Sequence, residues 1–107
     1  MKEKEELEKR ASAHAVDPDR LLDGEDPATR YVEDAAHWVT VYSELLLFKE
    51  RLVDTATEAL RNMTELHARD EVGSTDLVVL TAERDRLRRC LEYWKERQRE
   101  LGRRRKS

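Results

Sequence analysis

The chain has 107 residues, of which 42% are charged and 38% are hydrophobic, and its formal net charge is −3. This composition suits a thin, elongated core between long amphipathic helices better than a broad globular core. Three glycines, two prolines and no isoleucine argue against a β-sheet and favour an all-α fold. The longest purely apolar run, Leu45–Phe48, is far shorter than the roughly 20 residues that cross a bilayer, so we predict no membrane contact.

The single cysteine and the charged first ten residues indicate the cellular compartment. Cys90 is the only cysteine, so no disulfide can form within the chain and a reducing environment fits. The first ten residues are charged almost throughout and lack the apolar segment of a secretory signal. We therefore expect a cytoplasmic protein, and the excess of arginine over lysine, 15 to 6, favours a GC-rich bacterial genome.

Residues 1–26 are predicted to form a charged N-terminal segment with short helices. Residues 2–14 favour helix by propensity, but they contain few apolar side chains for burial. Asp17 and Pro18 then form an N-cap pattern, with Gly24 as a helix stop. Whether residues 1–16 pack on the rest of the chain is left open.

A long helix is predicted from the N-cap pattern Asp26–Pro27 to about Asp70. Its apolar residues recur at seven-residue intervals along three neighbouring lines. Together these lines cover about 160° of the helix surface, which is wider than the seam of a two-stranded coiled coil. One facing helix would not cover such a face.

A turn is predicted near residues 71–75, where Gly73 can adopt a left-handed conformation. A second amphipathic helix follows, because apolar residues alternate at spacings of three and four up to Gly102. A short connection makes the two helices antiparallel neighbours. The expected domain is therefore an antiparallel, coiled-coil-like hairpin over residues 27–102, followed by a basic tail over residues 103–107.

The predicted lengths of these helices are unequal, about 65 Å and about 40 Å at 1.5 Å per residue. Counting outward from the turn places Trp94 near Leu52, so that Trp38 and Tyr42 lie in an overhang without cover. Large exposed apolar surfaces commonly mark interfaces, so we expect two hairpins to pair as a homodimer in a four-helix bundle. The predicted interface and core residues are Tyr31, Trp38, Tyr42, Leu45, Phe48, Leu52 and Trp94.

Catalytic and metal chemistry finds little support in the residue pattern. Asp34 and His37, and likewise His67 and Glu71, share a helix face, but two ligands do not make a metal site and neither histidine has the preceding glutamate of di-iron bundles. Cys90 is interpreted as a small residue packed beside the core, because no nearby histidine could act as its base. We predict no enzyme activity, no cofactor and no metal.

Charge is unevenly distributed along the chain. Residues 1–76 hold 10 Lys/Arg and 19 Asp/Glu, giving −9, and residues 77–107 hold 11 and 5, giving +6. The basic end could contact phosphates through sequence-independent electrostatics; its residues are Arg103, Arg104, Arg105 and Lys106. Acidic residues interleave with the upstream arginines, which is more typical of ion pairs along a helix.

The predicted hairpin tip carries Asp70, Glu71 and Asp76 around Gly73. In outline it resembles the acidic-tipped coiled coils that enter the secondary channel of bacterial RNA polymerase, which implies contact with the transcription machinery. Our main prediction is a non-enzymatic scaffold or adaptor that binds a protein client and self-associates through residues 31–66. The alternative is a small regulator that contacts nucleic acid or the transcription machinery through its basic end or its acidic tip.

Overall fold

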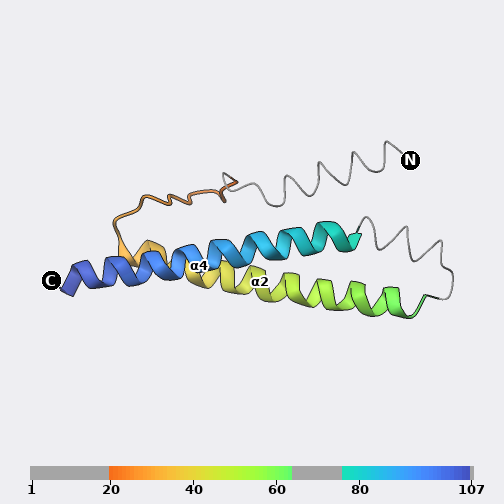
Figure 1. Cartoon of the computed structure of the whole chain (residues 1–107). Helices are drawn as coiled ribbons and strands as arrows, with labels where there is room; N and C mark the ends of the chain where they lie inside the picture. Colours follow the sequence, from red (N-terminus) through yellow and green to blue (C-terminus); the bar gives the residue numbers. More distant parts are fainter. Residues whose placement is uncertain (1–19, 64–75, 107) are drawn as a thin grey trace.

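The computed structural model describes residues 20–63 and 76–106, and it shows two long helices packed against each other. Helix α2 spans Val32–Arg61 and helix α4 spans Val78–Lys106. They run in opposite directions (Figure 1), and the described residues contain no strand. The predicted all-α helical hairpin is confirmed. The turn expected near 71–75 and the segment 1–19 lie outside the described residues.

The long helix does not begin at the Asp26–Pro27 pattern. The Ala28 N–H donates to Asp26 Oδ1 at 2.9 Å and the Thr29 N–H donates to the Asp26 carbonyl at 3.0 Å, so the expected cap closes a single turn. Tyr31 is then extended, with φ −98° and ψ 121°. Helix α2 therefore starts at Val32, with acidic residues in its first turn that complement the helix dipole.

Residues 20–31, called the N-terminal strap below, run back along the hairpin in the direction opposite to α2 (Figure 1). The strap contains a turn in which the Glu25 N–H donates to the Leu22 carbonyl at 3.0 Å. Gly24 has φ 81°, a conformation that favours glycine because it lacks a Cβ atom. The turn brings Glu25 towards the two helices.

The two helices match in length, with 30 residues in α2 and 29 in α4, or about 45 Å each. Helix α2 ends at Arg61, where the Asn62 and Met63 N–H groups donate to carbonyls of the last turn. The predicted overhang is consequently wrong. Trp94 stacks on Trp38, with ring centroids 6.3 Å apart, and does not lie opposite Leu52 as expected. The expected alignment was counted outward from the predicted turn, on the assumption that the first helix ran unbroken to it.

The hydrophobic core lies in the half of the hairpin that contains the start of α2 and the end of α4. Trp94 and Tyr42 are its largest fully enclosed side chains, and Leu22 from the strap packs against it. Its buried members are Ala35, Trp38, Tyr42, Leu46, Leu87, Leu91, Trp94 and Leu101. The other half is more thinly packed, since Val53 is the one further buried apolar residue of the described chain.

Candidate functional site

Glu25 joins the strap to both helices. Its Oε1 accepts a hydrogen bond from the Tyr42 hydroxyl at 2.6 Å, and its Oε2 accepts one from the Trp94 indole N–H at 2.7 Å. The Leu22 N–H also donates to Oε1. Burial, reinforced by the bond to Glu25, raises the pKa of Tyr42 above its usual value, so the hydroxyl keeps its proton and remains a donor.

Two backbone carbonyls of the strap are bound by side chains of α4. The Tyr93 hydroxyl donates to the Pro27 carbonyl at 2.5 Å, and Arg97 donates two hydrogen bonds to the Thr29 carbonyl at 2.7 and 3.2 Å. The buried Thr29 hydroxyl in turn donates to Asp34 Oδ2 at 2.6 Å. These bonds hold the strap against α4 and explain why the helix starts later than the sequence suggests.

A pocket of about 290 Å³ opens between the strap and α4. Arg86, Arg89 and Cys90 form part of its helical wall, and Arg20 and Leu21 line it from the strap. Cationic and apolar side chains therefore converge on one concavity, which is the arrangement expected of a small-molecule site.

The predicted interface and core residues separate into two groups. Trp38, Tyr42 and Trp94 are buried inside the single chain, at 8%, 0% and 1% exposure, so they are not available to a partner. The remaining four residues lie at or near the surface of α2 and its start, with Leu52 half-buried. Tyr31, Leu45 and Phe48 are exposed at 69%, 36% and 60%.

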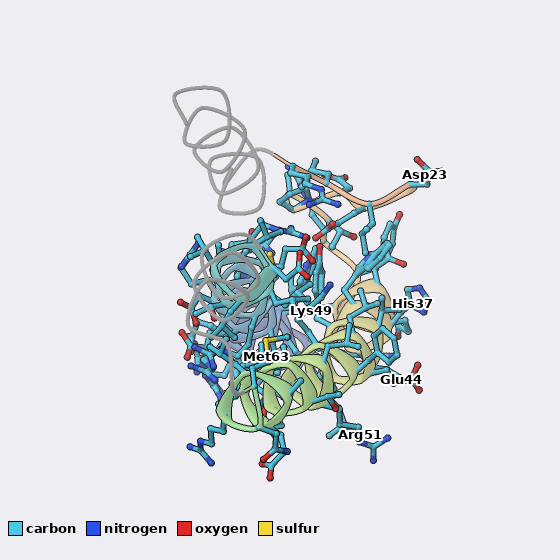
Figure 2. The ribbon with its side chains drawn as sticks, turned by 90° about the vertical axis from the view of Figure 1, so that its right-hand side faces the viewer. Asp23, His37, Glu44, Lys49, Arg51 and Met63 are labelled. Carbon is cyan, nitrogen blue, oxygen red and sulfur yellow. The ribbon has the colours of Figure 1, made fainter. Side chains whose placement is uncertain are left out.

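A line of exposed polar side chains runs along the surface of α2 that faces away from α4. His37, Glu44 and Arg51 point outward, whereas Lys49 lies between the helices (Figure 2), where it forms an ion pair with Glu83 of α4. Both partners of this pair are largely shielded from solvent. The pair indicates how α2 and α4 align along their length. Lys49 occupies a position in one of the apolar lines predicted from the sequence.

The basic end of α4 is engaged by carboxylates. Its nitrogen–oxygen pairs are Arg103–Glu96 at 3.4 Å, Arg104–Glu100 at 2.9 Å and Arg105–Glu33 at 2.7 Å. Hydrogen bonds from Arg99 and Arg103 hold the pKa of Glu96 below its usual value, and hydrogen bonds from its backbone and from Arg105 do the same for Glu33. The three arginines are thus less available to phosphates than the sequence alone suggests.

The remaining predicted features are only partly covered by the structure. Asp76 is exposed, but Asp70 and Glu71 of the predicted acidic tip lie outside the described residues, as does the side chain of Lys106. His37 is exposed and packs edge-on against Trp38 at 4.9 Å. Within residues 20–63 and 76–106, no three His, Cys, Asp or Glu side chains gather as metal ligands, and the second predicted pair, His67 with Glu71, falls outside that part.

Three residues of the site were missed by the sequence analysis: Glu25, Arg86 and Arg97. No local pattern identifies Glu25, because its two helical partners lie 17 and 69 residues away. A weak signal existed for Arg86, which precedes the core residue Leu87 and lies one helical turn before Cys90. Charged residues so close to an apolar line are candidates for burial.

Comparison with protein-family models, curated proteins and solved structures finds no match to this chain. In the described part of the chain, neither α2 nor α4 offers an apolar stretch long enough to traverse a bilayer.

Proposed function

We propose that this protein is a non-enzymatic helical interaction module that self-associates through α2 and presents the outer surface of the resulting bundle to a protein client. The observation that carries the proposal is one exposed apolar line on α2. Phe48 is 60% exposed and Leu45 is 36% exposed, and half-buried Leu52 continues the line. These spacings of three and four place the residues on one helix face, called the α2 patch below.

Charge supports a second copy as the partner. Helix α2 holds 3 Lys/Arg and 6 Asp/Glu, giving −3, whereas α4 holds 11 and 5, giving +6. In an antiparallel four-helix bundle with twofold symmetry, each α2 can lie between two α4 helices. Opposite charges then alternate around the bundle, which favours this pairing over two α2 helices side by side. As part of the proposal, the free Cys90 fits a reducing, cytoplasmic setting.

The solution mass tests the proposal. We expect light scattering after size exclusion to give twice the chain mass at high concentration, with dissociation on dilution. Phe48→Lys should weaken the dimer by at least ~10-fold, because it places a charge in an apolar contact. The matched control is Leu47→Lys, since Leu47 is similarly exposed, at 53%, but lies about 100° around the helix. A monomer mass at every concentration would contradict self-association.

The alternative, contact with nucleic acid or the transcription machinery, has weaker support. Arg103, Arg104 and Arg105 already have carboxylate partners, and binding phosphate would first have to break those pairs. If the alternative holds, removal of residues 103–107 should abolish salt-sensitive retention on DNA or RNA. The same truncation should leave the dimer intact if the main proposal holds.

A further inference from the structure

Arg86 is a buried charge without a counterion in the described part of the chain. The residue is 5% exposed, and its Nε is buried with no hydrogen-bond partner. Its Nη1 donates only to the Cys90 sulfur, at 3.8 Å, and sulfur is a weak acceptor. No carboxylate among the described residues forms an ion pair with Arg86.

Such burial is unfavourable unless something compensates it. A guanidinium keeps its proton under all ordinary conditions, so Arg86 cannot become neutral to avoid the cost. Buried charges in proteins are accordingly paired or hydrogen-bonded. Since Arg86 lines the pocket between the strap and α4, an anion entering that pocket would supply the missing partner.

The surroundings strengthen the preference for an anion. Arg20 and Arg89 line the same pocket, and no described carboxylate pairs with either. One carboxylate, Glu25, also lines it, but the oxygens of Glu25 already accept hydrogen bonds from both helices. The lining therefore holds three guanidinium groups and one carboxylate, a formal charge of +2, which favours an anion.

The other walls are apolar. Leu21 and Pro27 line the pocket from the strap, and Tyr93 and Trp94 line it from α4. A bare inorganic ion would leave these surfaces in contact with water, whereas an organic body would cover them. The volume of about 290 Å³ lies at the small end of the usual range for ligand pockets, roughly 300–1,000 Å³.

We propose that the pocket between the strap and α4 binds a small amphipathic carboxylate. The carboxylate pairs with the fork of Arg86, with Arg20 and Arg89 adding attraction, and the hydrocarbon part packs against Leu21 and Tyr93. A guanidinium and a carboxylate match as a two-bond pair. This site does not depend on the α2 patch, so it stands or falls separately from the proposed self-association.

Binding can be tested with the full chain and three probes: sodium phenylacetate, its neutral analogue phenylacetamide, and inorganic phosphate. We expect saturable, one-to-one binding of phenylacetate at low salt, and binding at least ~10-fold weaker for the amide, which lacks the charge. Phosphate should also bind more weakly, because it leaves the apolar walls uncovered. In NMR spectra, the indole N–H peak of Trp94 should shift more than that of Trp38, because Trp94 lines the pocket.

The decisive variant is Arg86→Met, which keeps the length of the side chain and removes its charge. It should lose phenylacetate binding by at least ~10-fold while unfolding at the same or a higher urea concentration, because the desolvated charge is gone. The control, Arg88→Met, alters an exposed arginine of the same helix and should bind as the native chain does. Arg89→Met tests the same pocket if Arg86→Met fails to fold, with an expected loss of ~3-fold or more.

Three results would overturn the assignment. The first is that phenylacetate does not saturate, and the second is that phosphate or the amide binds as tightly as phenylacetate. The third is unchanged phenylacetate binding in Arg86→Met, or in Arg89→Met if it is the folded variant. Phe48→Lys, the variant that tests self-association, should bind phenylacetate normally, which keeps the failure of one proposal distinct from the failure of the other.

Discussion

Among single residues, Glu25 makes structural contacts that no sequence pattern indicates. A carboxylate that accepts from Tyr42 and Trp94 at once satisfies two donors that the core would otherwise leave unpaired. Both of these rings belong to the most deeply buried part of the chain. Such donors are costly to bury without an acceptor. The sequence could not predict this contact, because it forms only when the strap folds back over both helices.

Replacement of Glu25 by alanine should destabilise the fold. The expected loss is roughly 1–3 kcal/mol, the cost of leaving buried donors without an acceptor, measured by urea unfolding with tryptophan fluorescence. Glu25→Gln should lose less, since an amide oxygen still accepts a hydrogen bond. Asp23→Ala is the matched control in the same strap, because Asp23 points into solvent (Figure 2), and its effect should stay within ~0.5 kcal/mol.

Trp38 belongs to the core of the single chain. From the sequence it was grouped with the interface and core residues, and in the structure it is 8% exposed and stacks on Trp94. Trp38→Ala should therefore lower the free energy of unfolding of the single chain, by about 3–5 kcal/mol, while Trp38→Phe should cost less. Circular dichroism during urea unfolding, carried out at a concentration where the chain is monomeric, separates this loss from any effect on association. Native stability of Trp38→Ala would contradict the core assignment.

At the scale of elements, the two halves of the hairpin differ in packing. The core cluster joins Ala35–Leu46 of α2 to Leu87–Leu101 of α4, with the strap across it. Toward the other end, residues 78–85 of α4 are half-buried or exposed. Local opening is easiest where few apolar contacts must be broken, so stability should decrease along the hairpin away from the strap.

Amide hydrogen exchange can measure this gradient. We expect the slowest exchange at Tyr42 and Leu91, and exchange at least ~10-fold faster at Glu58 and Thr81, although all four lie within helices. The strap variant Glu25→Ala provides the control, because it should accelerate exchange near Tyr42 more than near Glu58. Uniform protection along both helices would show that the hairpin opens as a single unit.

The spacing of apolar residues predicted the two helices well, but it predicted poorly which residues of one helix lie opposite which residues of the other. Apolar spacing from residue 27 to about 70, and after the predicted turn up to residue 102, was sufficient to predict two antiparallel helices, because each needs an apolar face against the other. The register depended on where α2 ends, and the helix stops at Arg61 with no glycine or proline to signal it. The ion pair between Lys49 and Glu83 was likewise invisible, since opposite charges occur throughout both helices.

At the scale of the whole molecule, a single chain covers more of its apolar face than the sequence suggested. The strap and α4 bury Trp38 and Tyr42, so only the smaller α2 patch is left for a dimer contact. The candidate pocket depends on the same strap, because the strap supplies the wall that lies opposite α4. The sequence could not predict that pocket, since residues 20–27 carry no pattern that places them against α4.

Acid should lower the thermal stability of the folded chain. Hydrogen bonds lower the pKa values of Glu33 and Glu96 in the folded chain. Their contribution to the free energy of unfolding is therefore present above the unfolded-state pKa of about 4.5, and it is lost as the pH falls through the lower pKa values of the folded state. The melting temperature should drop between about pH 5 and pH 3, and repulsion among 21 Lys/Arg should add to the drop. Both carboxylates are exposed, so added salt should reduce their part of the effect. A melting temperature independent of pH over this range would contradict the role of these pairs.

The long separation between the strap and its partners also affects how the protein is made. Glu25 and Trp94 lie 69 residues apart, and Thr29 and Arg97 lie 68 apart, so the ribosome produces the strap long before the helix that binds it. Until α4 emerges, the indole of Trp38 and the ring of Tyr42 have neither the opposing helix nor the closed strap to cover them. Chains at this stage are prone to aggregate or to be bound by chaperones. Ribosome-bound intermediates that end before residue 90 should therefore be more sensitive to protease than the finished chain.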